Sequence, residues 1–67
     1  MNTIKFNKQL YPKEIILQCI NDYNKHLHAE FEDINDYLLV KHPPEEQKIA
    51  LEFGNYVLAM VRANARS

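Results

Sequence analysis

Residues Pro43 to Asn64, PPEEQKIALEFGNYVLAMVRAN, form the stretch that decides how the rest of the chain can fold. Apolar residues recur in it at intervals of three and four, the spacing that places side chains along one side of an α-helix. The predicted stripe is Ile49, Phe53, Tyr56, Val57, Met60 and Val61. In a chain of 67 residues, a helix of about five turns must be the surface on which the other elements pack.

The two ends of this stretch carry residues that suit helix ends. Pro44 fits a first helical position, where a missing N–H costs no hydrogen bond, and Glu45 and Glu46 suit the positive end of the helix dipole. Arg62 and Arg66 lie near the negative end. We therefore predict that the whole stretch is one long helix.

The residues before it predict a strand followed by a first helix. In Thr3–Leu10, Ile4 and Phe6 alternate with polar residues, and Leu10 ends the strand, so one face is expected to be buried. A helical stripe follows along Pro12–His26, formed by Ile16, Cys19, Ile20 and Tyr23.

Two further segments, His28–Ile34 and Tyr37–Lys41, predict a β-hairpin. A two-residue loop at Ile34-Asn35 would place Phe31 opposite Leu38. That register gathers four apolar side chains on one face, namely Ala29, Phe31, Leu38 and Val40. Because isoleucine is a poor residue for a tight turn, a longer loop with the same pairing is the alternative.

The order strand, helix, strand, strand, helix predicts a single α+β domain over residues 1–67. The third strand is the most apolar and belongs in the centre, whereas the first and second carry charged residues that suit edges. We therefore predict a βαββα split unit, with a three-stranded antiparallel sheet in the order 1-3-2 and both helices on one face.

Composition excludes several classes of protein. Eight basic and nine acidic residues give a net charge of −1, and no basic run reaches three residues, which argues against nucleic-acid binding. The N-terminus lacks the apolar core of a signal peptide, and no segment approaches the ~20 apolar residues of a membrane span. We expect a cytoplasmic protein that binds neither membrane nor nucleic acid.

The three histidines are the residues that most resemble a metal site. His26, His28 and His42 fall near predicted chain turns, and His42 ends the strand beside the one that His28 begins. A zinc site needs three or four ligands in a tetrahedral array, which histidines split between a helix end and a strand start rarely supply. We predict solvent-facing histidines and no bound metal.

The remaining reactive side chains predict no enzyme. Cys19 lies among isoleucines on a helical stripe, which indicates a buried apolar residue rather than a reactive thiol. Glu30 and Glu32 share one strand face, but no apolar pocket or acid–base partner accompanies them. No Ser/His/Asp arrangement can be assembled. We expect no catalytic residues and no cofactor.

Apolar surface remains once the core is assigned, and it predicts contact with a partner. Leu51 and Leu58 recur at heptad spacing on the back of the long helix, while Tyr37 and Leu39 project from the outer face of the central strand. On the first strand, Lys5 and Asn7 line an edge to which an extended peptide could add. A chain this small also has a thin core that commonly needs a second subunit.

Two motifs resemble the HxsD-like proteins, small accessories of the His-Xaa-Ser peptide systems that occur with radical S-adenosylmethionine enzymes. One is Leu10-Tyr11-Pro12-Lys13-Glu14-Ile15, and the other is Phe53-Gly54-Asn55-Tyr56-Val57-Leu58. The second is similar to the family stretch Leu-Leu-Asn-Asp-Tyr-x-Leu-Arg-Glu, but Asn55 stands in place of aspartate and Ala59-Met60 in place of Arg-Glu.

This resemblance implies a non-catalytic accessory protein that assists the maturation of a ribosomally made peptide. A structural or interaction module that forms a homodimer and has no peptide client is the alternative. The two hypotheses share the prediction of a protein–protein contact.

Overall fold

A computed structural model describes residues 1–65, and its elements follow the predicted order. They are β1 (Asn2–Asn7), α1 (Lys13–Asp22), β2 (Glu30–Ile34), β3 (Tyr37–His42), a 3-10 turn η1 (Pro44–Glu46) and α2 (Gln47–Ala65). Arg66, predicted to lie near the end of the helix dipole, and Ser67 are outside the described residues.

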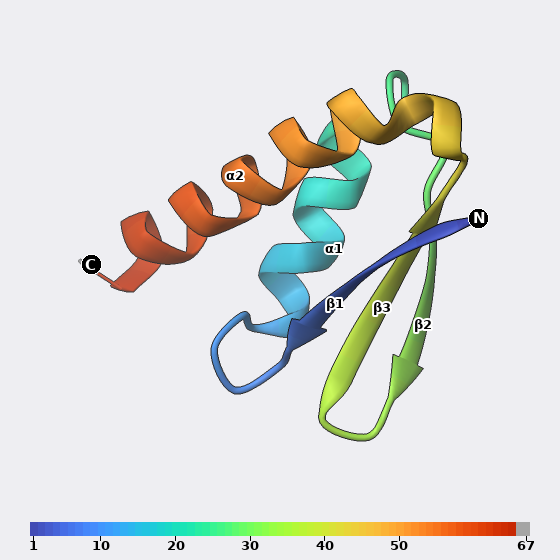
Figure 1. The fold of residues 1–67 in the computed structure, drawn as a ribbon. Coiled ribbons are helices and arrows are strands. Elements are labelled where there is room, and N and C mark those ends of the chain that lie inside the picture. The colour runs from blue at the N-terminus through green and yellow to red at the C-terminus, as the bar shows by residue number, and fades with distance from the viewer. Residues whose placement is uncertain (66–67) are drawn as a thin grey trace.

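The three strands form one sheet in the order β1-β3-β2, and both neighbours of β3 run antiparallel to it. Both helices pack on one side of this sheet. α1 connects β1 to β2, and α2 crosses the sheet and runs on toward the C-terminus (Figure 1). This confirms the predicted α+β architecture, including the central position of the third strand.

The core lies between the sheet and the helices. Its buried apolar residues are Phe6, Ile16, Cys19, Leu27, Leu38, Val40, Ala50, Phe53 and Val57. The Phe53 ring meets those of Phe6 and Tyr23 edge to face, with centroids 6.2 and 5.6 Å apart. All six residues of the predicted α2 stripe are in this core or pack against it. The predicted stripe did not include Ala50, which is buried because it lies one turn before Phe53 on the same side of the helix.

The first strand and the first helix are shorter than the sequence suggests. β1 stops at Asn7 because the chain turns there: the backbone N–H groups of Leu10 and Tyr11 both donate to the Asn7 carbonyl oxygen. Leu10 is consequently 67% exposed, so its predicted place on the buried face is wrong. Pro12 precedes α1, and the helix ends at Asp22 rather than His26.

The β2–β3 hairpin has a different register from the predicted one. Its loop is Asn35-Asp36, and Phe31 pairs with Val40 rather than with Leu38. Asn35 has a φ of 49°, a left-handed conformation that asparagine adopts more readily than most residues. The pairing moved by two residues, an even number, so each side chain kept its predicted face.

Neither α1 nor α2 is long and apolar enough to cross a membrane, within the residues that the structure describes.

Candidate binding surface

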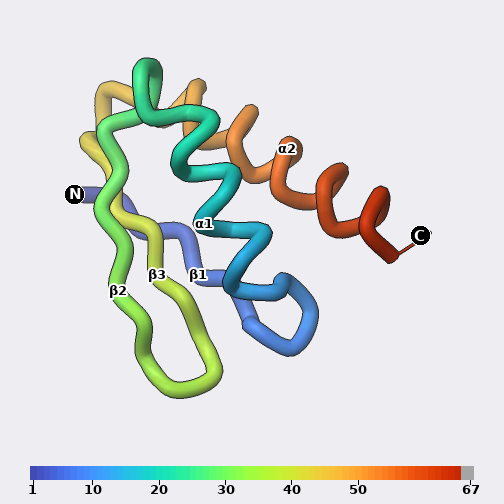
Figure 2. The backbone as a smooth tube through the Cα atoms, turned by 180° about the vertical axis from the view of Figure 1, so that it is seen from behind, coloured from blue at the N-terminus to red at the C-terminus, as the bar shows by residue number. Residues whose placement is uncertain are grey.

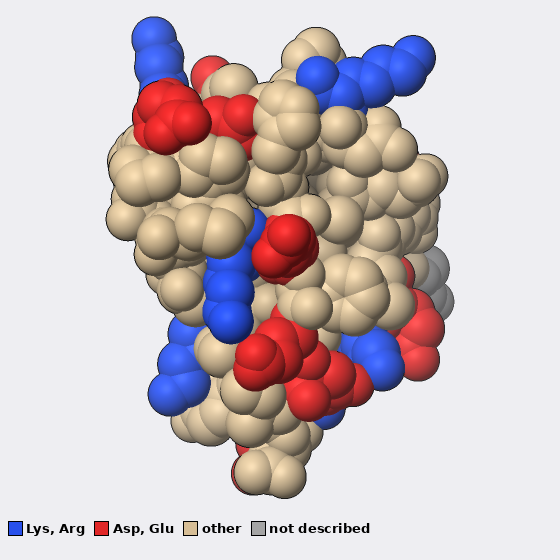
Figure 3. Space-filling model, turned by 90° about the vertical axis from the view of Figure 1, so that its right-hand side faces the viewer, with Lys and Arg blue, Asp and Glu red and all other residues tan. Residues whose placement is uncertain are grey.

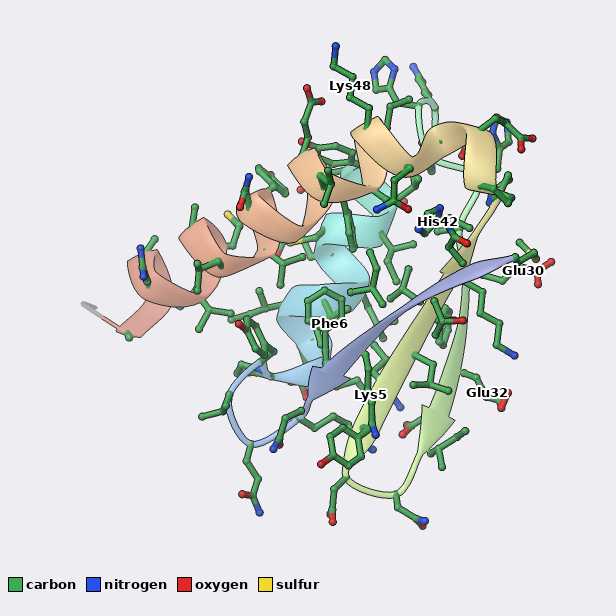
Figure 4. The ribbon with its side chains drawn as sticks, viewed as in Figure 1. Lys5, Phe6, Glu30, Glu32, His42 and Lys48 are labelled. Atoms are coloured by element: carbon green, nitrogen blue, oxygen red, sulfur yellow. The ribbon has the colours of Figure 1, made fainter. Side chains whose placement is uncertain are left out.

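The register divides the strand side chains between two sides of the sheet. On the helix-facing side lie Asn2, Ile4, Phe6, Phe31, Asp33, Leu38, Val40 and His42. On the opposite side, which we call the outer face, lie Thr3, Lys5, Asn7, Glu30, Glu32, Ile34, Tyr37, Leu39 and Lys41. Figure 4 shows the division: the Phe6 side chain points toward the helices, whereas Glu30 and Glu32 point away from them.

Four of the six predicted partner-binding residues come together on the outer face. Lys5 pairs with Leu39, and Asn7 pairs with Tyr37, so the four form a block across β1 and β3. The Lys5 Nζ lies 4.1 Å from the centroid of the Tyr37 ring, a cation–π contact. The block therefore presents an aromatic ring, an aliphatic side chain, a cation and an amide on one surface.

The other two predicted residues, Leu51 and Leu58, lie on α2 and do not join this block. Leu51 is 62% exposed, whereas Leu58 is half-buried. The exposed apolar surface of α2 is therefore narrower than the heptad spacing indicated, and it centres on Leu51.

The structure adds two exposed apolar residues on β2 that sequence reasoning did not assign to a surface. Ile34, expected in the turn, pairs with Tyr37 and extends the apolar part of the outer face. Phe31 lies on the helix-facing side, yet it is 51% exposed. The turn preference of Asn35 could have predicted the correct loop and placed Ile34 in the strand, whereas the exposure of Phe31 depends on helix packing.

Every residue of β2 is exposed, which sets this strand apart from the rest of the sheet. In both backbone views β2 lies at the side of the molecule opposite the C-terminal end of α2 (Figures 1 and 2). Within residues 1–65 no further strand pairs with its free edge, nor with that of β1. The backbone N–H and C=O groups along these two edges are open to a partner strand.

The three acidic residues of β2 differ in the ion pairs that they form. The Asp33 carboxylate accepts from Lys13 Nζ at 2.7 Å and also from Lys8, and these bonds lower its pKa from the usual range. Glu32 accepts from Lys41 Nζ at 3.3 Å. Glu30 makes no ion pair with any described residue. Figure 3, which faces the β2 side, shows acidic side chains at the centre of this surface with basic side chains beside them.

The prediction that all three histidines face solvent is wrong for His42. His42 is 1% exposed, because it ends β3 on the helix-facing side, and its Nδ1 donates to the Pro43 carbonyl oxygen at 2.8 Å. His28 is exposed, and its backbone N–H donates to Glu46 Oε1 at 2.7 Å. That bond is the largest cause of the lowered pKa of Glu46, followed by the bond from the His28 ring.

These polar contacts attach the segment between α1 and β2 to η1. Glu46 of η1 holds both the backbone and the ring of His28. No group of three or more His, Cys, Asp and Glu side chains is placed to hold a metal ion anywhere in residues 1–65.

Cys19 and Tyr56 belong to the helix pair rather than to a surface site. Burial raises the pKa of the Cys19 thiol, and the Asp22 carboxylate raises it further. The Tyr56 hydroxyl donates to Asp22 Oδ2 at 2.8 Å, and this bond raises the pKa of the phenol. This contact joins α2 to the last turn of α1.

Comparison of this chain with protein-family models, with curated proteins and with solved structures finds no match.

Proposed function

We propose that this protein is a small non-catalytic accessory that binds an extended segment of a peptide or protein partner on its sheet. We further propose that the partner is a ribosomally made peptide on which a radical S-adenosylmethionine enzyme acts. The observation that carries the proposal is the sheet itself, which, over the described residues 1–65, has helices on one side only and two free edges. An extended segment can add to such an edge through main-chain hydrogen bonds, without needing a deep pocket.

The outer face supports this proposal through its composition. Tyr37, Leu39 and Ile34 give it apolar area at the hairpin end of the sheet, and Lys5, Lys41, Glu30 and Glu32 lie beside that area. Protein interfaces likewise combine apolar area with neighbouring polar and charged residues. The side chains of a strand added at either edge would extend this surface.

The HxsD-like resemblance is the support for the identity of the client. Each of its two motifs contributes residues to the core or its margin: the Tyr11 ring packs edge to face on Phe6 with centroids 5.2 Å apart, and Phe53 is fully buried. Because these residues maintain the fold, the motifs favour a shared architecture first and a shared role second.

The proposal is tested by titrating the ¹⁵N-labelled protein with synthetic segments of the peptides encoded beside a neighbouring radical-enzyme gene. We expect amide shift changes in the sheet for one such segment and none for a scrambled version. If every encoded segment leaves the sheet resonances unchanged at millimolar concentration, the peptide-accessory proposal is wrong.

Self-association is the second candidate, and the exposure of Leu51 favours it. An exposed leucine on a long helix offers an apolar contact to a second copy of a small domain. Light scattering at micromolar concentration should then show a dimer that Leu51→Glu dissociates, with Glu52→Gln as the neighbouring control. A monomer at all concentrations would exclude this candidate and leave the accessory proposal standing.

A further inference from the structure

We infer that the free edge of β2 is the docking edge, and that its partner is an extended segment in which basic and apolar residues alternate. This inference rests on the proposed function, since it names the edge and the partner chemistry for the same kind of binding. It also departs from the sequence prediction, which favoured the β1 edge at Lys5 and Asn7.

The exposure of β2 favours its edge as the docking edge. A strand hydrogen-bonded to the free edge of β2 would cover backbone and side chains that are all exposed at present. On β1, by contrast, both apolar residues of the helix-facing side are already covered at least in part: Ile4 is half-buried, and Phe6 is 5% exposed and packs against Tyr11. Pairing at β2 would therefore remove more apolar surface from water than pairing at β1.

The incomplete burial of Phe31 also favours the β2 edge. Its partner across the ladder is Val40, which is fully buried, yet Phe31 itself is 51% exposed. The side chain shares the helix-facing side of the sheet with Val40, but it is not part of the buried core. An apolar residue of an added strand would stand beside Phe31 on the helix-facing side, within reach of its ring.

The negative charge of β2 indicates the chemistry of the partner. Glu30 and Glu32 flank Phe31 and lie on the outer face, so residues that alternate with the apolar one would stand beside these carboxylates. Lys41 forms its ion pair with Glu32, and Glu30, its partner across the ladder, forms none with any described residue. Basic residues at these two positions complement the edge, which gives the pattern basic, apolar, basic for the bound segment.

The same charges disfavour a second copy of this chain as the occupant. Antiparallel pairing of β2 with β2 of another molecule, with Phe31 opposite Phe31, would place Glu30 opposite Glu32, and like charges across a strand pair are destabilising. Asp33 is anchored by Lys8 and Lys13 on the β1–α1 side, so it holds the end of the strand in place rather than attracting a ligand.

The test uses a capped peptide in which lysine and valine alternate, titrated into the full ¹⁵N-labelled protein. We expect the largest amide shift changes over Glu30–Ile34. The matching glutamate–valine peptide should not bind. Two variants sharpen the test: Glu30→Lys with Glu32→Lys, and a control of equal charge change on α2 and η1, Glu45→Lys with Glu52→Lys.

The β2 double variant should weaken binding of the lysine–valine peptide by about tenfold or more and gain binding of the glutamate–valine peptide, while the control keeps the original preference. Equal weakening by both variants, shift changes confined to Asn2–Asn7 or to Leu51, or no binding at millimolar peptide would each overturn the inference. Binding of a client segment mapped to β1 would overturn it and leave the proposed function standing.

Strand addition can also be tested with the unmodified protein, independently of how the variants fold. Methylating the peptide nitrogens on every second residue removes the N–H donors along one edge of the peptide. Methylation on one set should weaken binding by about tenfold or more, whereas methylation on the other set should be tolerated. If both sets are tolerated equally, the peptide does not bind as a strand and the inference is wrong.

Discussion

The two edge strands, β1 and β2, pair with the same central strand but differ in what surrounds them. β1 places Phe6 against Tyr11 and Phe53 in the aromatic part of the core. β2 has the same kind of alternation, but its aromatic residue, Phe31, is half exposed and every residue of the strand is accessible. The helices cover the β1 side of the sheet more completely than the β2 side.

This difference separates two roles that an edge strand can have. An edge whose inward side chains are covered contributes to stability, and its lysine discourages pairing with other chains. An edge whose side chains are uncovered contributes little to stability and keeps its surface available for binding. We therefore expect substitutions in β1 to change folding and substitutions in β2 to change binding.

The largest expected effect comes from the two phenylalanines. Phe6→Ala removes a buried ring that contacts the rings of Tyr11 and Phe53, and it should cost about 3–5 kcal/mol of unfolding free energy. Phe31→Ala should cost about 1 kcal/mol or less, because half of the side chain is already in water. Chemical denaturation of both variants measures the difference. Equal losses would mean that β2 is as much a part of the core as β1.

A smaller effect is expected at the hairpin turn that sets the β2 register. Asn35→Val places a β-branched residue in a left-handed conformation, which should cost about 1–2 kcal/mol. Asn35→Gly is the matched control and should be tolerated, since glycine adopts this conformation freely. Amide spectra should show the disturbance in β2 and β3, with β1 shifts largely retained. A tolerated valine would indicate that the turn does not hold the register.

The sequence was sufficient to predict the fold because its strongest patterns coincide with the buried elements. The α2 stripe and the apolar β3 strand each bury the side chains that the periodicity indicated. The candidate surface was predictable only in part. Lys5, Asn7, Tyr37 and Leu39 follow from strand alternation, which survives an even shift of register.

What the sequence did not reveal depends on contacts between distant segments. Leu10 and Phe31 belong to apolar alternations, yet both are more than half exposed, because helix coverage ends before it reaches them. His42 is buried for the opposite reason, since η1 and α2 begin directly over the end of β3. Alternation assigns a residue to a face of the sheet, but only the three-dimensional packing decides whether that face is covered there.

The smallest expected effect is a pH dependence at the anchored end of β2. The bonds from Lys13 and Lys8 hold the pKa of Asp33 below its unfolded value of about 3.9. Their stabilisation is therefore present above that value and is lost as the pH falls through the lower, folded pKa. Wild-type protein should lose more stability between pH 6 and pH 2 than Asp33→Asn does.

Carboxyl chemical shifts give the control for this prediction, since they report the Asp33 midpoint directly. A midpoint at or above the unfolded value would show that the ion pairs with Lys8 and Lys13 do not form in solution, and that the end of β2 is held only by its ladder with β3.

Amide hydrogen exchange with and without saturating lysine–valine peptide distinguishes the two edges, because it reports which edge of the sheet gains hydrogen bonds. If β2 is the docking edge, alternate amides of Glu30–Ile34, those directed to the free edge, should exchange rapidly in the free protein and become protected when the peptide binds. The β1 amides should exchange at the same rate in both states. New protection along Asn2–Asn7, with β2 unchanged, would contradict the assignment of β2 as the docking edge.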